Sequence, residues 1–244
     1  MAYTFITGAT SGLGEAAAKL IAKERDCILL GRDLDRLKAV GDFCTQFGHN
    51  VLLFPYDLLE VEALGGTVKA FLNDHAVNVE SFVHFAGMTE LLPMSKTKYS
   101  VGLQVMKVNY FSACEIISTL LKRKVNGEAL KNIVLVSSIA AAIGAKHQPH
   151  YCASKGAINS LVSALARDLA PQIRVNAISP GSFQTRMWDT PLLQPISADS
   201  WNPSLLSPGQ PVQVATVVNF LLSNNASYIT GANIHVDGGE HLRF

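Results

Sequence analysis

A tyrosine and a lysine stand four residues apart in the stretch "YCASK", as Tyr151 and Lys155. On a helix this spacing places the phenol and the ammonium group on one face, so both can project into one pocket. A tyrosine with its ordinary pKa near ~10 is a poor base at neutral pH, but a neighbouring cation favours the phenolate. The pair therefore indicates proton transfer, although this spacing is also common by chance.

Two further polar residues could act with this pair. The apolar run "NIVLVSS" ends at Ser138, thirteen residues before Tyr151, and "KVNYFS" places Asn109 in a helical segment before that run. A serine hydroxyl could hydrogen-bond a reacting oxygen, but it could equally cap a helix or a turn. Asn109 could likewise be an ordinary polar residue of a helix.

Glycines gather near the start of the chain, in "TGATSGLG". Gly8, Gly12 and Gly14 follow the apolar run "YTFI" and precede an alanine-rich helical pattern. Glycines at such a junction permit a tight turn, close approach of the backbone to a diphosphate, and close packing of helix on strand. The helix N-terminus offers N–H groups and a partial positive charge to phosphates. The alternative is a glycine-rich turn without a ligand.

The elements that must position these residues form a regular alternation. Most apolar runs are nearly continuous, as is typical of parallel strands covered on both faces, and segments such as "EAAAKLIAKE" between them have helical spacing. The predicted strands are Tyr3–Thr7, Cys27–Gly31, Val51–Tyr56, Ser81–Phe85, Asn132–Ser137, Arg174–Ser179 and Asn233–Val236. This pattern predicts an α/β fold: a Rossmann-like, doubly wound, mainly parallel seven-stranded sheet with helices on both faces.

We expect one domain over residues 1–244, with a substrate loop at about 182–211. That segment is rich in proline and serine, and it is too long for an ordinary connection. Its apolar residues are candidates for a substrate wall, for internal packing or for a subunit contact. They are Met187, Trp188, Leu192, Leu193 and Trp201.

Composition excludes several classes of protein. The 244 residues are 48% hydrophobic and 16% charged, which suits a folded core, and the net charge of +1 argues against a nucleic-acid surface. No apolar stretch reaches the ~18 residues of a membrane span, and no signal peptide is recognised. The seven histidines form no HExxH pattern, so no metal site is predicted. The four cysteines are scattered, which favours reduced thiols in the cytoplasm: Cys27, Cys44, Cys114 and Cys152.

Taken together, the glycine spacing G-x-x-x-G-x-G and the ordered set Asn109, Ser138, Tyr151 and Lys155 resemble the short-chain dehydrogenase/reductase family. The resemblance covers nearly the whole chain. Within the family, the sequence is similar to the 3-oxoacyl-[acyl-carrier-protein] reductases. The resemblance implies Tyr151 as general acid in reduction and general base in oxidation. Lys155 would lower the pKa of Tyr151 and hold the nicotinamide ribose. Ser138 would bind the substrate oxygen, and Asn109 would support a water-linked proton relay.

The resemblance also implies a dinucleotide site. Its members would be the glycine-rich turn, the ends of the third, fourth and sixth strands, and the catalytic pair: Gly8, Thr10, Ser11, Gly12, Leu13, Gly14, Asp57, Leu58, Ala86, Gly87, Tyr151, Lys155, Pro180, Gly181, Phe183 and Thr185. Asp57 would accept a hydrogen bond from the adenine amino group, or act as a helix N-cap. In "HFAG" this chain departs from the family, because His84 and Phe85 replace two asparagines.

The residues after the second predicted strand bear on the cofactor. NAD enzymes place an acid there for the ribose 2′-hydroxyl, whereas NADP enzymes supply arginine for the 2′-phosphate. Here Gly31 takes the place of the acid and Arg32 follows it. This arrangement favours NADP. NAD stays the alternative, because Asp33 could reach the hydroxyl and Arg32 could instead pair with Asp33 or face solvent.

We therefore expect an NADP(H)-dependent oxidoreductase that transfers a hydride between nicotinamide and a carbonyl or secondary alcohol. The alternatives are an NAD-dependent alcohol dehydrogenase, and a catalytically silent sensor or scaffold with the same fold.

The expected partners are a small-molecule substrate and further copies of the chain. The helix that begins near Tyr151 and the segment Val101–Leu121 are apolar around much of their circumference, which predicts a homotetramer or homodimer. We expect no nucleic-acid or membrane partner. An acyl carrier protein could meet a set of basic residues, although a solvated helix face explains them more simply. They are Lys96, Lys98, Lys107, Lys122, Arg123 and Lys124.

Overall fold

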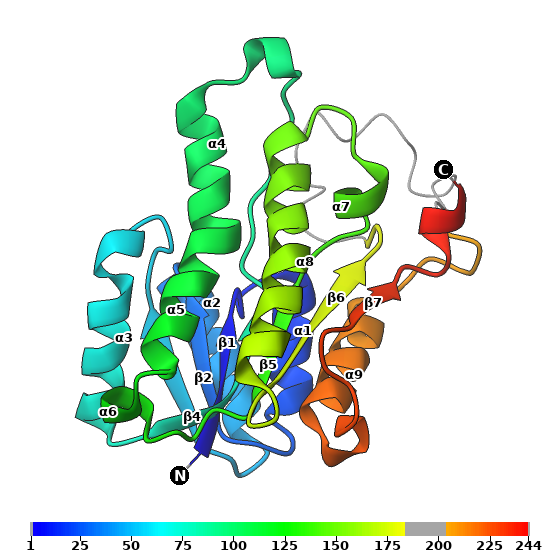
Figure 1. Ribbon diagram of the computed structural model, residues 1–244. Helices are drawn as coiled ribbons and strands as arrows, with labels where there is room; N and C mark the ends of the chain where they lie inside the picture. Colours follow the sequence, from blue (N-terminus) through cyan, green and yellow to red (C-terminus); the bar gives the residue numbers. More distant parts are fainter. Residues whose placement is uncertain (1, 184–203, 244) are drawn as a thin grey trace.

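The computed structural model describes residues 2–183 and 204–243 and contains a seven-stranded sheet flanked by helices (Figure 1). The strand order is β3-β2-β1-β4-β5-β6-β7, and every pairing in the sheet is parallel. The strands are β1 (Ala2–Thr7), β2 (Cys27–Gly31), β3 (Val51–Pro55), β4 (Asn78–His84), β5 (Asn132–Val136), β6 (Arg174–Pro180) and β7 (Asn233–Val236). The predicted doubly wound fold is confirmed.

Helices cover both faces of this sheet, because strand side chains alternate between the faces. Phe5 belongs to the core on the face of α3 (Val61–His75), α5 (Ser112–Leu120) and α8 (Pro149–Leu169). Its neighbour Ile6 belongs to the core on the opposite face, formed with α1, α2 and α9. The other helices of the described chain are α1 (Gly12–Ile21), α2 (Leu34–Thr45), α4 (Tyr99–Met106), α6 (Arg123–Asn126), α7 (Ala140–Ile143) and α9 (Pro211–Leu222).

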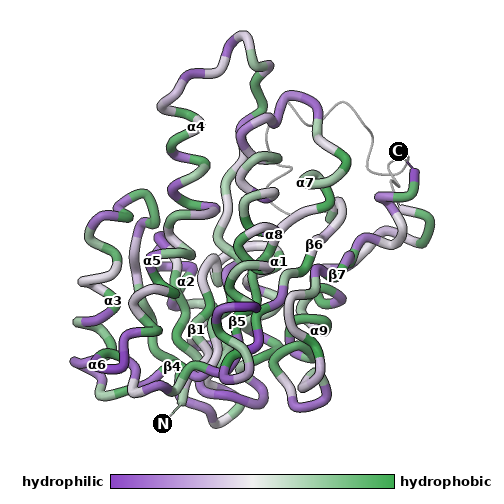
Figure 2. The backbone as a smooth tube through the Cα atoms, viewed as in Figure 1, coloured by the Kyte–Doolittle hydropathy of each residue, from purple (hydrophilic) through white to green (hydrophobic). Residues whose placement is uncertain are grey.

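Hydropathy follows this layering. In Figure 2 hydrophobic stretches run through the sheet, whereas much of the hydrophilic chain lies in the connections at its two ends. The strands β1, β2, β5 and β6 are buried along nearly their whole length. Within the ranges given above, we find no helix with both the length and the apolarity required to cross a bilayer.

The strand order reverses between β1 and β4, which places a crevice at their carboxyl ends. Thr7 and His84 are register partners at the ends of these two strands. The segments after them, after β5 and after β6 therefore meet at one edge of the sheet. Most of the predicted site residues lie in these segments.

The predicted substrate loop is described only in part. Ser182, Phe183 and residues 204–211 are described, but Thr185 and the five candidate wall residues named above lie outside the described residues. The loop therefore stays a prediction.

Candidate active site

The glycine-rich turn lies tightly against the end of β4. A Cβ atom on Gly8 would come within 2.7 Å of the backbone nitrogen of Ala86, and a Cβ atom on Gly14 would collide with the carbonyl of Gly8. Gly12 has φ of 52°, a conformation that favours glycine. Ser11, the N-cap of α1, makes no side-chain cap bond, so the first-turn N–H groups have no side-chain cap. Such a helix N-terminus suits a diphosphate.

Asp57 and Leu58 follow β3 at the same edge of the sheet. One carboxylate oxygen of Asp57, Oδ1, accepts the N–H of Leu59 at 3.0 Å, and the residue is exposed. Glu60 is the N-cap of α3, so the alternative role of Asp57 as that N-cap is wrong. Leu58, the next residue, is buried, and so is Ala86 after β4.

The residues after β2 include the two candidates for contact with the cofactor ribose, Arg32 and Asp33. Asp33 is the N-cap of α2: it accepts the N–H of Arg36 at 3.1 Å and forms an ion pair with the Nε of Arg36 at 3.1 Å. Arg32 is exposed and makes no ion pair or hydrogen bond with the described residues. The carboxylate of Asp33 is thus engaged within its own helix, whereas the guanidinium of Arg32 is free.

Ser138, Tyr151 and Lys155 come together where β5 meets α8. The hydroxyl of Ser138 is close enough to the phenol of Tyr151 to lower its pKa. The Nζ atom of Lys155 lies 5.8 Å from the centroid of the Tyr151 ring and donates to the carbonyl of Val136 at 2.8 Å. The hydroxyl of Ser137 donates to the carbonyl of Lys155 at 3.0 Å. These contacts fix the first turns of α8 to the end of β5.

Burial controls the charge of both members of this pair. Burial raises the pKa of Tyr151, and the hydrogen bond from Ser138 lowers that pKa in part. Burial also lowers the pKa of the Lys155 ammonium to about 8. The protein by itself therefore keeps the phenol protonated at neutral pH, which is the form that donates a proton.

Asn109 lies in a π-helical turn, Lys107–Phe111, that joins α4 to α5. Its Oδ1 accepts the N–H of Met88 at 2.8 Å, and its Nδ2 donates to the carbonyl of Met88 and to the hydroxyl of Ser154, both at 2.9 Å. Asn109 is fully buried and links the segment after β4 to α8. Single π-helical turns are frequent at functional sites. The water-linked relay stays a prediction.

Comparison with known proteins agrees with this geometry. A family model described as "Enoyl-(Acyl carrier protein) reductase" matches residues 8–241. A crystal structure titled "Short-chain dehydrogenase/reductase SDR:Glucose/ribitol dehydrogenase" from Brucella melitensis is 30% identical, with a TM-score of 0.86, and the match covers 98% of this chain and 96% of that one. The chain belongs to the short-chain dehydrogenase/reductase family. It therefore belongs to a family of oxidoreductases that use nicotinamide dinucleotides and act on small molecules.

Two other relatives carry more specific names. The 3-oxoacyl-[acyl-carrier-protein] reductase FabG of Rickettsia prowazekii is 30% identical over 242 residues, which cover 97% of this chain and 95% of that protein. A 4-hydroxyisoleucine dehydrogenase, solved in complex with NADH and succinate, is 26% identical with a TM-score of 0.84. That match covers 97% of this chain and 98% of the other.

His84, which replaces an asparagine of the short-chain dehydrogenase/reductase pattern, braces the central strands. Its Nε2 lies 3.2 Å from the carbonyl of Val108, which can only accept, so Nε2 carries the proton. Its Nδ1 then accepts the hydroxyl of Thr7 at 2.9 Å, and Thr7 in turn accepts the N–H of Ala86 at 3.2 Å. Burial lowers the pKa of His84 to about 3. The ring is a neutral connector between β1, β4 and the π-helical turn.

Glu90 was missed by sequence reasoning. It is only 6% exposed, and its carboxylate accepts the N–H of His150 at 2.5 Å and that of Tyr151 at 3.1 Å. These are N–H groups of the first turn of α8, which begins at Pro149 and has no side-chain cap bond from its own N-cap residue. Glu90 thus caps the helix that carries Tyr151. A single acid within the apolar stretch "MTELLPM" was the only signal in the sequence.

We expect Glu90→Ala to lower the free energy of unfolding by about 1–3 kcal/mol, because it removes a cap and leaves buried N–H groups unpaired. Urea unfolding checks this. Glu60→Ala is the matched control: Glu60 is also at a helix start, but it is exposed and makes no side-chain cap bond. Equal stability of the two variants would contradict the assignment of Glu90.

The segment after β6 approaches the end of β7. A Cβ atom on Gly181 would lie 2.7 Å from the Cβ of Asp237, so only glycine fits there. Glu240 accepts the N–H of Ser182 at 2.6 Å and its hydroxyl at 2.7 Å. Pro180 ends β6, and Phe183 is buried in the core of the α1, α2 and α9 face. Phe183 therefore packs internally, and its predicted contact with the nicotinamide stays a prediction.

Proposed function

We propose that this protein is an NADP(H)-dependent oxidoreductase that interconverts a carbonyl compound and a secondary alcohol. The observation that carries the proposal is the phenol of Tyr151, which lies beside Ser138 and Lys155 at the carboxyl edge of the sheet. The glycine-rich turn lies at the same edge. When bound there, the nicotinamide dinucleotide supplies or takes the hydride.

Residues of this chain fit each part of the dinucleotide. The uncapped start of α1 would hold the diphosphate, and the exposed carboxylate of Asp57 would accept from the adenine amino group. Lys155 would hold the nicotinamide ribose. The free guanidinium of Arg32 and the engaged carboxylate of Asp33 support NADP over NAD. The relative solved with NADH keeps NAD as the alternative.

The chain's own residues would handle the proton. In reduction, Ser138 and Tyr151 would hydrogen-bond the substrate oxygen, and Tyr151 would donate its proton as negative charge develops there. In oxidation the same phenol, deprotonated, would accept the proton of the alcohol. Lys155 would stabilise the phenolate electrostatically. Acid–base catalysis of this type contributes roughly 10²–10⁴-fold to a rate.

Consumption of NADPH in the presence of a ketone panel tests the proposal. Cyclic ketones, sugars, and acyl thioesters should be assayed with NADPH and NADH in parallel. We expect oxidation of NADPH with at least one substrate class. Tight binding of NADPH without turnover across the panel would instead favour the sensor or scaffold.

A 3-oxoacyl thioester is the first substrate class to try, given the FabG relative. The basic residues do not form one face for a carrier protein, because Lys98 precedes α4 and Lys124 lies in α6, at opposite ends of the α4–α5 column (Figure 1). Lys107 is already paired with Glu62 at 2.9 Å. The solvated-face interpretation is therefore favoured over an acyl carrier protein.

We propose that the protein forms a homotetramer, with α5 and α8 at one interface. A groove between these helices is lined largely by apolar side chains, among them Ile117, Leu121, Leu161 and Leu165. A second copy of the chain would bury them. Light scattering should give the mass of four chains, and Leu165→Glu should halve it by breaking one interface. A stable monomer of the unmodified chain at micromolar concentration would overturn this prediction.

We also propose a cytoplasmic location. All four cysteines are free thiols, of which Cys27 and Cys44 are buried. Burial raises the pKa of the Cys44 thiol to about 11, which keeps it protonated and unreactive. Free thiols suit a reducing compartment.

A further inference from the structure

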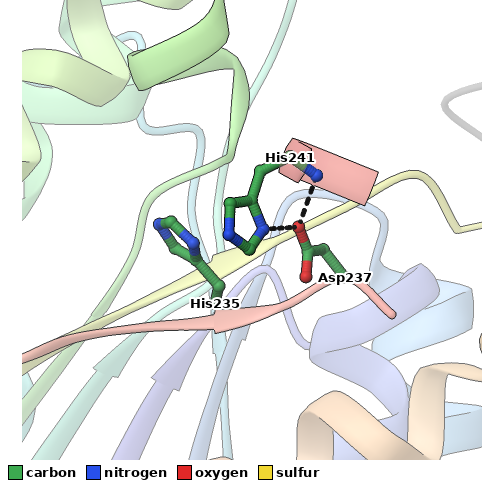
Figure 3. Close-up of side chains that lie close together, drawn as sticks. All are labelled: His235, Asp237 and His241. Atoms are coloured by element: carbon green, nitrogen blue, oxygen red, sulfur yellow. Dashed lines mark hydrogen bonds and ion pairs between the residues drawn. The ribbon is translucent and has the colours of Figure 1, made fainter. Parts of the chain in front are cut away.

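Three side chains with metal-binding groups meet where β7 ends (Figure 3). His235 and Asp237 are two residues apart at the end of the strand, so both project from the same side of the chain. Gly238 and Gly239, with φ of 58° and 80°, then reverse the chain into the 3₁₀ turn Glu240–Arg243. This turn returns His241 to a position beside both residues.

The carboxylate of Asp237 is held firmly. Its Oδ1 accepts the N–H of Gly239 at 3.0 Å, and its Oδ2 accepts the backbone N–H of His241 at 2.9 Å and the ring Nδ1–H of His241 at 2.5 Å. Asp237 is 8% exposed, whereas His235 is exposed and His241 is half-buried. A fixed carboxylate is thus presented to two imidazoles that solvent can reach.

The three groups are close enough for one ion. One ligand atom from each residue lies within 4.8 Å of the others. The ring centroids of His235 and His241 are 4.3 Å apart, with an interplanar angle of 69°. Tetrahedral zinc, with bonds of about 2.0–2.2 Å to nitrogen and oxygen, needs ligand atoms roughly 3.3 Å apart. A rotamer change of the exposed His235 can shorten the distance between its ring nitrogen and the other two ligand atoms.

We propose that His235, Asp237 and His241 form a binding site for a divalent transition-metal ion, with Zn²⁺ as the best match. Two imidazole nitrogens and one carboxylate oxygen are ligands that zinc prefers, and a water molecule would complete the tetrahedron. Mg²⁺ and Ca²⁺ prefer oxygen ligands and fit poorly. Sequence reasoning predicted no metal site, because the spacing H-x-D-x-x-x-H is not the HExxH pattern.

The position of the site indicates a structural role. Asp237 packs against Gly181, and Glu240, in the same turn as His241, holds Ser182. An ion here would tie β7 to the 3₁₀ turn and thereby fix the segment that follows β6. The alternative is that Asp237 and His241 form only an ion pair that stabilises the turn. This inference does not depend on the proposed reaction.

Isothermal titration of Zn²⁺ and Mg²⁺ into the untagged, chelator-treated chain tests the site. We expect one Zn²⁺ per chain, a rise in the unfolding temperature with Zn²⁺, and neither effect with Mg²⁺. His235→Ala, at an exposed position, should weaken Zn²⁺ binding by at least about 10–100-fold, since loss of even an outer-shell partner costs that much. His241→Ala should do the same.

His49→Ala is the matched control, because His49 lies 3.6 Å from the carboxylate of Asp26 and is also accessible. This variant should bind Zn²⁺ as the unmodified chain does. Absence of Zn²⁺ binding to the unmodified chain would overturn the proposal. So would unchanged affinity in both His235→Ala and His241→Ala, because the ion would then be bound elsewhere, for example at the free thiols.

Discussion

Tyr151→Phe is expected to lower turnover by roughly 10²–10⁴-fold while the affinity for NADPH stays within about twofold. The substitution removes only the phenol hydroxyl, which lies beside Ser138. The ring that lies near Lys155 is kept, and so is the backbone N–H that Glu90 caps. Steady-state kinetics with the best ketone, together with fluorescence titration of NADPH, measures both quantities.

Tyr228→Phe is the control for this substitution. It removes the same hydroxyl group, but from a side chain that is fully exposed. It should leave turnover unchanged. If Tyr151→Phe keeps turnover within about tenfold of the unmodified protein, another group donates the proton, and Tyr151 is not the general acid.

Arg32→Ala is expected to weaken NADPH binding by about 10–100-fold and to leave NADH binding nearly unchanged. A hydrogen bond to a charged group contributes roughly 1.5–3 kcal/mol, and ~1.4 kcal/mol corresponds to a tenfold change in affinity. Arg32 is exposed and free of partners among the described residues, so its loss should not disturb the fold. Titration of both reduced cofactors at one salt concentration gives the result.

Lys38→Ala serves as the charge-matched control, since Lys38 is exposed on α2 and loses the same charge. It should change the affinity for NADPH far less than Arg32→Ala does. If the unmodified protein prefers NADH, or if Arg32→Ala weakens both cofactors equally, the NADP assignment is wrong. Gly31→Asp would restore an acid at the end of β2, but it is not a clean test, because a Cβ atom there would lie 2.5 Å from the Cγ2 of Thr10.

The sheet was predictable because its signals are local. Continuous apolar runs such as "CILLG" leave only a parallel, doubly covered strand as a good solution, and β2 and β7 have the predicted bounds. Strand ends were less certain: β4 begins at Asn78 rather than Ser81. The extra residues alternate between exposed and buried positions, so they lack the continuous apolar signal of the strand interior.

Residues that act through long-range contacts could not be predicted in the same way. Glu90 caps a helix that begins about sixty residues later in the chain, and the role of His84 depends on Val108, which lies in another element. The pairing of Asp33 with Arg36 is local, but from the sequence only Arg32 was considered as a partner of Asp33. The approach of His235 to His241 depends on the glycine turn between them. These contacts depend on how the chain brings separate residues together, and residue types alone do not show that.

The fate of the transferred hydride tests the central claim most directly. NADPH that carries deuterium at its transferable position should be incubated with the protein and the best ketone of the panel, and the products analysed by mass spectrometry and NMR. We predict one deuterium on the carbinol carbon for each NADP⁺ formed, and almost none of this product with Tyr151→Phe. Deuterated NADPH that binds tightly but stays reduced with every ketone and acyl thioester would contradict the account.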